Sequence, residues 1–195
     1  MGEQLASILY QHNAKVYVAV RSEEKATKAI NGIKARLPNS KGQLVFLHLD
    51  LGDLTTIKKS AEEFKSKEQR LDVLWLNAGV MAPPQGSKTA QGYELQLGTN
   101  NLGHFLFTKL LHPILAKTAA SAPPNSVRVV WVSSTAAQFA PNPPVNFENI
   151  DYKKKDESAL TKYARSKAGN VIHGAEFARR AKGEGIISVV RRCQD

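Results

Sequence analysis

The sequence predicts an α/β protein built on a doubly wound parallel sheet, with helices on both faces of the sheet. Short aliphatic runs alternate with longer segments of helical period along the whole chain of 195 residues. The short runs are apolar on both faces, which is typical of buried parallel strands. Neither an internal repeat nor a polar linker interrupts this alternation. We therefore expect a single domain over residues 1–195.

Strands are expected where short runs of aliphatic or aromatic residues, many of them β-branched, stand between turn residues. Such side chains pack well on a pleated and buried surface. The expected strands are 15–20 (KVYVAV), 43–49 (QLVFLHL), 71–76 (LDVLWL), 127–132 (VRVVWV) and 186–190 (IISVV).

Helices are expected over five segments whose apolar residues repeat with the helical period. In the first segment Leu5, Ile8 and Leu9 share one face. The second stops at Pro38, and Asp53 stands at the N-cap position of the third. An irregular, proline-bearing segment follows the fourth strand, and loops of that length are usually functional or disordered. The helices are 2–12, 23–37, 54–67, 92–117 and 159–182, and the irregular segment is 136–157.

The chain is basic, with 27 Lys and Arg against 17 Asp and Glu, a net charge of +10. A basic protein suggests a nucleic-acid partner, but here the excess is spread along the chain. Its one short run is 153–155, without interleaved aromatic residues or a nucleic-acid-binding motif. An anionic small ligand accounts for the same sign of charge, so we expect no nucleic-acid partner.

Other classes are excluded by composition. No stretch approaches the roughly 18 consecutive apolar residues that a membrane-spanning helix needs. The first residues lack the basic start and apolar run of a signal peptide. Cys193 is the single cysteine, so a disulfide framework and a cysteine-based zinc site are excluded, and a reducing compartment, the cytoplasm, is expected. His48 and His104 are interpreted as packing residues, and no metal site is expected.

Polar residues follow each of the first four predicted strands, at the point where the strand ends. The carboxyl ends of parallel strands meet at one edge of a sheet, and a dinucleotide binds at that edge in doubly wound folds. We therefore expect these residues to gather around a dinucleotide. They are Arg21, then Asp50 with Leu51, then Asn77, Ala78 and Gly79, and last Ser133 and Ser134.

Tyr163 and Lys167 form the strongest single signal in the chain. Residues four apart share one face of a helix, so the ammonium of Lys167 would lie beside the phenol of Tyr163. A neighbouring cation lowers the pKa of a phenol and makes it a usable proton donor near neutral pH. Taken alone, the pair is better explained by an exposed Tyr and Lys on an amphipathic helix.

The pair does not stand alone, because four motifs occur in a fixed order. NAG follows the third strand, NNLGHF lies at 100–105, VSS ends the fourth strand, and YxxxK lies at 163–167. This ordered set resembles the short-chain dehydrogenase/reductase family, over residues 2 to about 189. The stretch LGHFLFTKLL and the long segment between Ser134 and Tyr163 look most like the retinol-dehydrogenase-like branch and its fungal members.

The resemblance implies a catalytic tetrad of Asn100, Ser134, Tyr163 and Lys167. Tyr163 would protonate a carbonyl oxygen in reduction or deprotonate an alcohol in oxidation. Lys167 would lower its pKa and hold the nicotinamide ribose, and Ser134 would stabilise charge on the substrate oxygen. Asn100 would bend its helix around a water that relays protons from Lys167. Ser133 is the weaker serine candidate, because successive strand residues point to opposite faces.

The resemblance also implies a Rossmann-like fold that binds NADP(H). Asp50 would contact the adenine amino group with the Leu51 backbone beside it, and the segment Asn77-Ala78-Gly79 would pass under the adenosine ribose. Arg21 stands where a guanidinium would meet the 2′-phosphate, which favours NADP(H) over NAD(H). A solvated arginine at a strand end is the plainer alternative for Arg21.

The chain departs from the family pattern at both ends. The family opens with a strand and a T-G-x-x-x-G-x-G turn that holds the pyrophosphate, and Gly2 aligns with the last glycine of that turn. The absent strand would lie between 15–20 and 71–76, so two unpaired strand edges are expected. Beyond 186–189 the substrate-capping lid and last strand are also missing. We therefore expect an incomplete NAD(P)-binding domain, and Asn101, where this branch often has His, is a local variation.

Two functions from different classes are consistent with this sequence. The first is an NADP-dependent oxidoreductase that interconverts an alcohol and a ketone or aldehyde on a small lipophilic substrate, and it is the one we favour. The second is an inactive, truncated remnant or a regulatory partner of a full-length relative. Relatives often form homodimers through the helices equivalent to 92–117 and 159–182, and others are monomeric.

Overall fold

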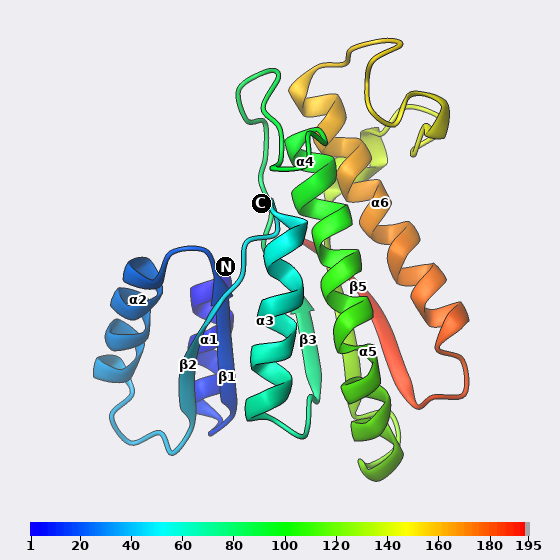
Figure 1. Cartoon of the computed structure of the whole chain (residues 1–195). Coiled ribbons are helices and arrows are strands. Elements are labelled where there is room, and N and C mark those ends of the chain that lie inside the picture. Colours follow the sequence, from blue (N-terminus) through cyan, green and yellow to red (C-terminus); the bar gives the residue numbers. More distant parts are fainter. Residues whose placement is uncertain (194–195) are drawn as a thin grey trace. The chain divides into compact units, whose positions relative to one another are not determined.

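A computed structural model of the chain describes residues 1–193. Contacts divide the chain into two compact units, Met1–Asp50 and the residues from Leu51 onward (Figure 1). No helix among the described residues is both long enough and apolar enough to span a membrane. The expectation of a single domain stays a prediction.

The first unit is a two-stranded parallel sheet with two helices. Strand β1 (Lys15–Val20) pairs with β2 (Gln43–His48) in register, from Lys15 opposite Gln43 to Val20 opposite His48. Helix α1 (Gly2–Gln11) precedes β1, and α2 (Glu23–Arg36) connects the two strands. The side chain of Ser22 caps α2 by accepting a hydrogen bond from the Lys25 amide. The core of this unit consists of Ala6, Tyr10, Ile30, Ile33 and Leu44.

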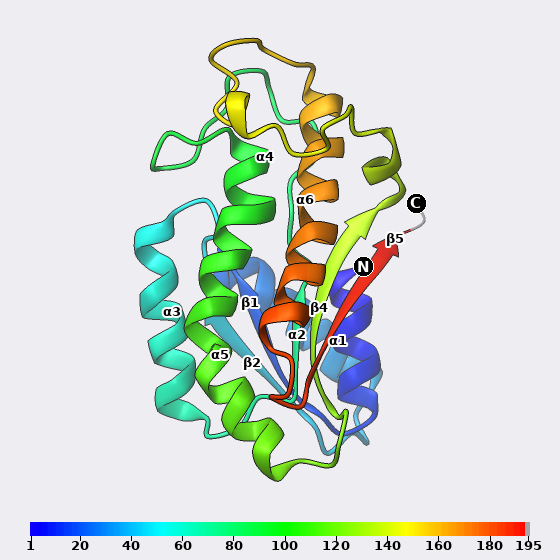
Figure 2. The same ribbon diagram turned by 90° about the vertical axis from the view of Figure 1, so that its right-hand side faces the viewer.

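The second unit holds a three-stranded parallel sheet in the order β3-β4-β5. Its helices α3, α5 and α6 cover one face of this sheet, as Figures 1 and 2 show. Apolar side chains that are almost fully buried, among them Ile57, Leu115, Val129 and Trp131, lie in this unit. In chain order its elements are α3 (Leu54–Lys67), β3 (Val73–Leu76), α4 (Leu95–Leu97), the π-helix η1 (Gly98–Gly103), α5 (His104–Ser121), β4 (Val127–Ser134), the 3₁₀-helices η2 (Thr135–Phe139) and η3 (Phe147–Asn149), α6 (Ala159–Arg180) and β5 (Ile186–Cys193).

The α/β class with parallel strands is confirmed, and so is the Asp53 cap, whose carboxylate accepts a hydrogen bond from the Thr55 amide at 3.0 Å. The strands form two sheets, β1-β2 and β3-β4-β5. Within residues 1–193, β1 pairs only with β2 and β3 pairs only with β4. Each of these two strands therefore has one unpaired edge, as the sequence predicted.

Several element boundaries differ from the prediction, among them those of β4, β5 and the helix expected from residue 92. Strand β4 continues to Ser134 and β5 to Cys193, because Ser133 and Ser134 pair in register with Arg192 and Cys193 beyond the aliphatic runs. The helix expected from residue 92 begins at Leu95, and its second turn is π-helical rather than α-helical. Packing of η1 against its neighbours, which the helical period does not encode, accounts for this change.

Candidate active site

The two serines that end β4 face different partners. Ser133 Oγ donates a hydrogen bond to the Lys167 carbonyl oxygen at 2.7 Å, so it is used in holding α6. Ser134 Oγ accepts a hydrogen bond from the Ala136 amide at 3.1 Å and caps η2. Since that bond uses only a lone pair, the O–H of Ser134 is able to donate to a ligand.

Helix α6 carries Tyr163 and Lys167 one turn apart. The helix is capped by Ser158, whose Oγ accepts a hydrogen bond from the Thr161 amide at 3.1 Å. Tyr163 is half-buried, whereas Lys167 is only 5% exposed. The Lys167 ammonium lies 5.7 Å from the centroid of the Tyr163 ring and donates to the Val132 carbonyl at 3.2 Å. A buried cation this close favours the ionised form of a phenol.

Asn100 lies in η1 and is fully buried. Its Nδ2 donates to the Val80 carbonyl at 3.0 Å and to Ser166 Oγ at 2.9 Å, and its Oδ1 accepts from the Val80 amide at 2.8 Å. The side chain thereby joins the segment that follows β3 to the helix that carries Tyr163 and Lys167. π-helical turns of this kind are frequent at functional sites.

Gly79, the last residue of the Asn77-Ala78-Gly79 segment, fits closely against the tetrad. A Cβ at this position would lie 2.9 Å from Asn100 Oδ1 and 3.6 Å from Lys167 Nζ. The absence of a side chain therefore allows the backbone after β3 to pass beside both groups. This close approach of backbone to the Lys167 ammonium fits the binding of a nucleotide, whose ribose hydroxyls are suitable acceptors for that ammonium.

The remaining expected cofactor residues fall in both units. Leu51 is buried in the second unit, where its carbonyl oxygen would lie 2.5 Å from a Cβ placed on Gly103. In the first unit, Arg21 follows β1 and is exposed, and Asp50 follows β2 and is half-buried. They lie at the same edge of the two-stranded sheet, because the strands are parallel and in register. Gly2 is the exposed first residue of α1.

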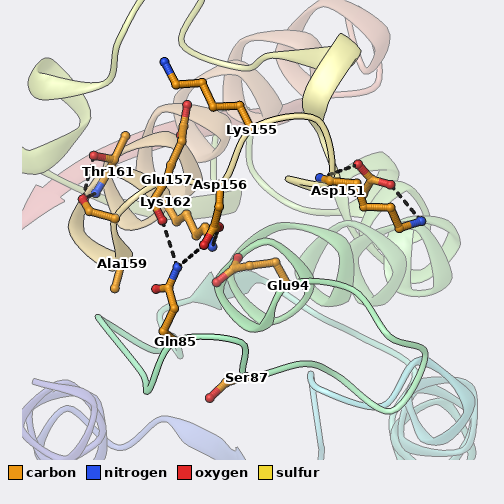
Figure 3. A network of polar contacts seen from close by, with 12 residues as sticks. Gln85, Ser87, Glu94, Asp151, Lys155, Asp156, Glu157, Ala159, Thr161 and Lys162 are labelled. Carbon is orange, nitrogen blue, oxygen red and sulfur yellow. Dashed lines mark hydrogen bonds and ion pairs between the residues drawn. The ribbon is translucent and has the colours of Figure 1, made fainter.

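A polar tie joins the loop after β3 to the N-terminus of α6 (Figure 3). The Gln85 amide donates to the Asp156 carboxylate and, at 3.2 Å, to the Glu157 carbonyl oxygen. The same carboxylate accepts from the ammonium of Lys162, which is only 6% exposed. A cavity of about 570 Å³ lies between residues 83–94 and 151–162. The tie thus fixes the helix immediately before Tyr163, a role that the sequence did not suggest for Lys162.

His104 begins α5 and is only 2% exposed. Its Nδ1 lies 3.1 Å from the Asn100 carbonyl oxygen, so this nitrogen carries the proton and donates it. Burial in the first place, and then the positive charge of Lys167, lowers the pKa of His104 to about 3. The imidazole is therefore neutral at physiological pH.

A neutral buried imidazole makes stability depend on pH. On unfolding, His104 regains an ordinary pKa of 6.5 and takes up a proton in acid. The free energy of unfolding is thus expected to be fully retained above pH 6.5 and to fall as the pH drops toward 3. The variant His104→Phe should flatten this dependence between pH 6.5 and about 5, above the range where carboxylates titrate.

Urea denaturation of the wild type and His104→Phe at several pH values measures this dependence. If the free energy of unfolding depends on pH equally in the two proteins, another group causes the dependence. His173 is the natural alternative, because burial also lowers its pKa.

Contacts bring Asn100, Gly79, Lys167 and Tyr163 together, and Ser134 ends the strand directly after Ser133, which binds the Lys167 carbonyl. The structure adds Asn170, which the sequence analysis did not name, and it gives partners to Asn101, which the sequence analysis treated as a local variation. Asn101 and Asn170 are almost fully buried and bonded to each other. Asn170 stands three residues after Lys167, which places it on the same side of the helix, and this spacing was the available signal.

Comparison with known proteins adds relatives over nearly the whole chain. A model of the short chain dehydrogenase family matches residues 1–145. The short-chain dehydrogenase/reductase pkfC of Emericella nidulans is 58% identical over 190 residues, which cover 96% of this chain and 61% of the relative. A short-chain dehydrogenase/reductase of Phomopsis amygdali is 57% identical over 97% of this chain and 57% of the relative. The chain thus spans about three-fifths of the length of these fungal relatives.

Solved structures agree on the fold. A crystal structure from Mycobacterium paratuberculosis matches with a TM-score of 0.79 and 30% identity, over 98% of this chain and 64% of that chain. The RhlG/NADP complex of Pseudomonas aeruginosa matches with a TM-score of 0.72 and 22% identity, over 97% of this chain and 68% of that chain. The predicted assignment to a retinol-dehydrogenase-like branch stays a prediction. The ordered motifs, the family-model match over residues 1–145 and the 58% identity to a fungal relative lead to one conclusion: the chain belongs to the short-chain dehydrogenase/reductase family.

Proposed function

We propose that this chain carries the catalytic groups of an NADP(H)-dependent oxidoreductase, which interconverts an alcohol and a ketone or aldehyde on a small lipophilic substrate. One observation carries the proposal. A buried lysine ammonium lies 5.7 Å from the ring of a half-buried tyrosine, and the Lys167 ammonium and the Asn100 side chain both lie beside Gly79. Carbonyl reduction requires a protein to supply a proton donor and a group that stabilises the negative charge developing on the carbonyl oxygen.

When bound, the nicotinamide supplies or accepts the hydride. Tyr163 donates its phenolic proton to the carbonyl oxygen in reduction and removes the hydroxyl proton in oxidation. Ser134 donates a hydrogen bond to the same oxygen and stabilises the negative charge that develops there. Lys167 favours the phenolate of Tyr163 and binds ribose hydroxyls, and Asn100 holds the backbone after β3 beside Lys167.

NADP(H) is proposed over NAD(H) because of Arg21. This exposed guanidinium follows β1, and a guanidinium forms strong, bidentate hydrogen bonds with a phosphate. Solved relatives support either cofactor: the RhlG structure and a metagenomic oxidoreductase are complexes with NADP, and another similar structure is an NADH-dependent reductase. The charge of Arg21 therefore carries the preference. Asp50, Leu51 and Gly2 are proposed as the other cofactor contacts of their segments.

Steady-state kinetics on the protein as its own cells make it test both parts of this proposal. We expect NADPH-dependent reduction of lipophilic ketones, with deuteride from labelled NADPH appearing on the carbinol carbon. The variant Arg21→Asp should weaken the binding of NADPH by roughly tenfold more than the binding of NADH, a difference of about 1.4 kcal/mol in binding free energy. The control is Lys28→Asp, at an exposed position in the middle of α2. It makes the same change of charge and should weaken the binding of both cofactors equally.

Two results would contradict the proposal separately. Equal losses for the two cofactors in Arg21→Asp would show that Arg21 does not contact the 2′-phosphate. Absence of label on any carbinol product, with a folded protein that binds NADPH, would remove the oxidoreductase assignment itself.

A further inference from the structure

Asn101 lies beside the proposed tetrad residue Asn100 and makes a different set of contacts. Its Nδ2 donates to the Ser166 carbonyl oxygen and to Asn170 Oδ1, both at 2.8 Å. The two asparagines are 4% and 1% exposed, so neither bond is shared with bulk water. Buried hydrogen bonds of this kind hold groups in a single arrangement.

The chain of contacts continues to the proposed catalytic lysine. Asn170 Nδ2 donates to the Val132 carbonyl oxygen at 3.0 Å, and Lys167 Nζ donates to the same oxygen at 3.2 Å. A carbonyl oxygen has two lone pairs, so the Asn170 amide occupies one side of it and leaves the other to the ammonium. The position of the Lys167 ammonium therefore depends on where the Asn170 amide points.

A carboxamide has a donor and an acceptor end, which exchange places when the group rotates. Turned the other way, Asn170 would direct its oxygen at the Val132 oxygen. The bond from Asn101 prevents this, because a donor that faces Asn170 Oδ1 fixes which end points to Val132. Space around Asn101 is restricted as well, since a Cβ on Gly169 would lie 2.7 Å from Asn101 Nδ2.

We propose that Asn101 is a positioning residue for proton transfer: through the Asn170 amide and the Val132 carbonyl it sets where the Lys167 ammonium lies. This inference rests on the proposed function, because it assigns Asn101 an effect on the step that Tyr163 performs. Tyr163 of α6 and His104 of α5 are ionisable groups near Lys167, and β4 presents the Val132 carbonyl oxygen to it. His104 stays neutral there, so Lys167 supplies the positive charge.

The experiment compares pH profiles of kcat for NADPH-dependent ketone reduction in the full-length protein. Asn101→Leu and Asn170→Leu remove the two amides while keeping the same branched arrangement of heavy atoms, and Asn101→Ser and Asn170→Ser form a second, smaller pair in case the leucine variants do not fold. We expect each change to move the limb of the profile due to Tyr163 toward alkaline pH by about one unit. The double variant should shift no further than either single variant, since both act through one carbonyl.

Thr118→Val is the matched control. It removes a buried hydroxyl that accepts a hydrogen bond from the Leu71 amide at 2.9 Å, at the far end of α5 from η1. It should lower the melting temperature as the asparagine variants do, and leave the pH profile where it is in the wild type. A purely structural role for Asn101 would give the same result as this control.

Each other outcome is decisive. Unchanged profiles in the asparagine variants, or additive shifts in the double variant, overturn the route through Asn170 and Val132. Turnover that survives in Tyr163→Phe overturns the proposed function instead, and so the two failures are distinguishable.

Discussion

Tyr163→Phe is expected to lower kcat by roughly 10²–10⁴-fold while NADPH still binds. The substitution removes one oxygen from a half-buried ring and leaves Lys167, Asn100 and Ser134 in place. Loss of the phenol leaves the developing alkoxide without a proton donor, because the Ser134 hydroxyl at its ordinary acidity can only donate a hydrogen bond. Steady-state kinetics measure kcat, and titration of nicotinamide fluorescence measures cofactor binding.

Tyr152→Phe is the matched control for this result. Tyr152 also has a lysine near its ring, with Lys162 Nζ at 4.9 Å from the centroid. Burial first, and then the charges of Glu94 and Glu157, raises the pKa of Tyr152 to about 12, so it is a poor proton donor at neutral pH. We expect the loss of the Tyr152 hydroxyl to change kcat by less than about twofold. Undiminished kcat in Tyr163→Phe would remove Tyr163 from its proposed role.

Gly103→Ala is expected to lower the free energy of unfolding by roughly 2–3 kcal/mol. A Cβ at Gly103 would lie 2.5 Å from the Leu51 carbonyl oxygen and 2.9 Å from the Leu51 Cβ, so one of the two segments must move. Backbone cannot yield as a flexible side chain does. The movement would also displace η1, which carries Asn100 and Asn101, and kcat should fall together with stability.

Gly32→Ala provides the contrasting case. Gly32 lies within α2, and a Cβ there would meet only the end of the Arg36 side chain, at 3.6 Å. Alanine favours the helix, so the free energy of unfolding should rise by about 0.5–1 kcal/mol. Urea denaturation measures both variants. A Gly103→Ala protein as stable as the wild type would show that Leu51 and η1 are not held together in solution.

Much of the fold could be predicted from local patterns. Short apolar runs identified the five strands of residues 1–193, and the N-cap at Asp53 was recognised because a carboxylate before an amphipathic segment is a local signal. The continuation of β5 through Arg191 and Arg192 was not predicted, since these residues are strand only by pairing with β4. A basic sequence gives no such indication by itself.

In the candidate site too, residues that belong to local motifs could be predicted, and residues joined only by tertiary contacts could not. Ser134, Tyr163, Lys167 and Asn100 belong to motifs and could be named, although their roles stay proposals. Asn101 and Asn170 could not be connected, because they are 69 positions apart in sequence and meet only when η1 packs on α6. The π-helical turn itself depends on tertiary packing, which a helical period does not describe.

The contact between Asn100 and Val80 has a consequence for which side chains this position accepts. The carboxamide of Asn100 bonds both the amide and the carbonyl of one residue, which is the pattern that a neighbouring strand offers in a sheet. At Val80, four residues after the end of β3, a side chain thus makes the pair of bonds that a backbone would otherwise make. Aspartate would place an oxygen against the Val80 oxygen, serine would be too short, and glutamine would be one methylene too long. Asparagine is the one residue that can stand in for a strand at this place.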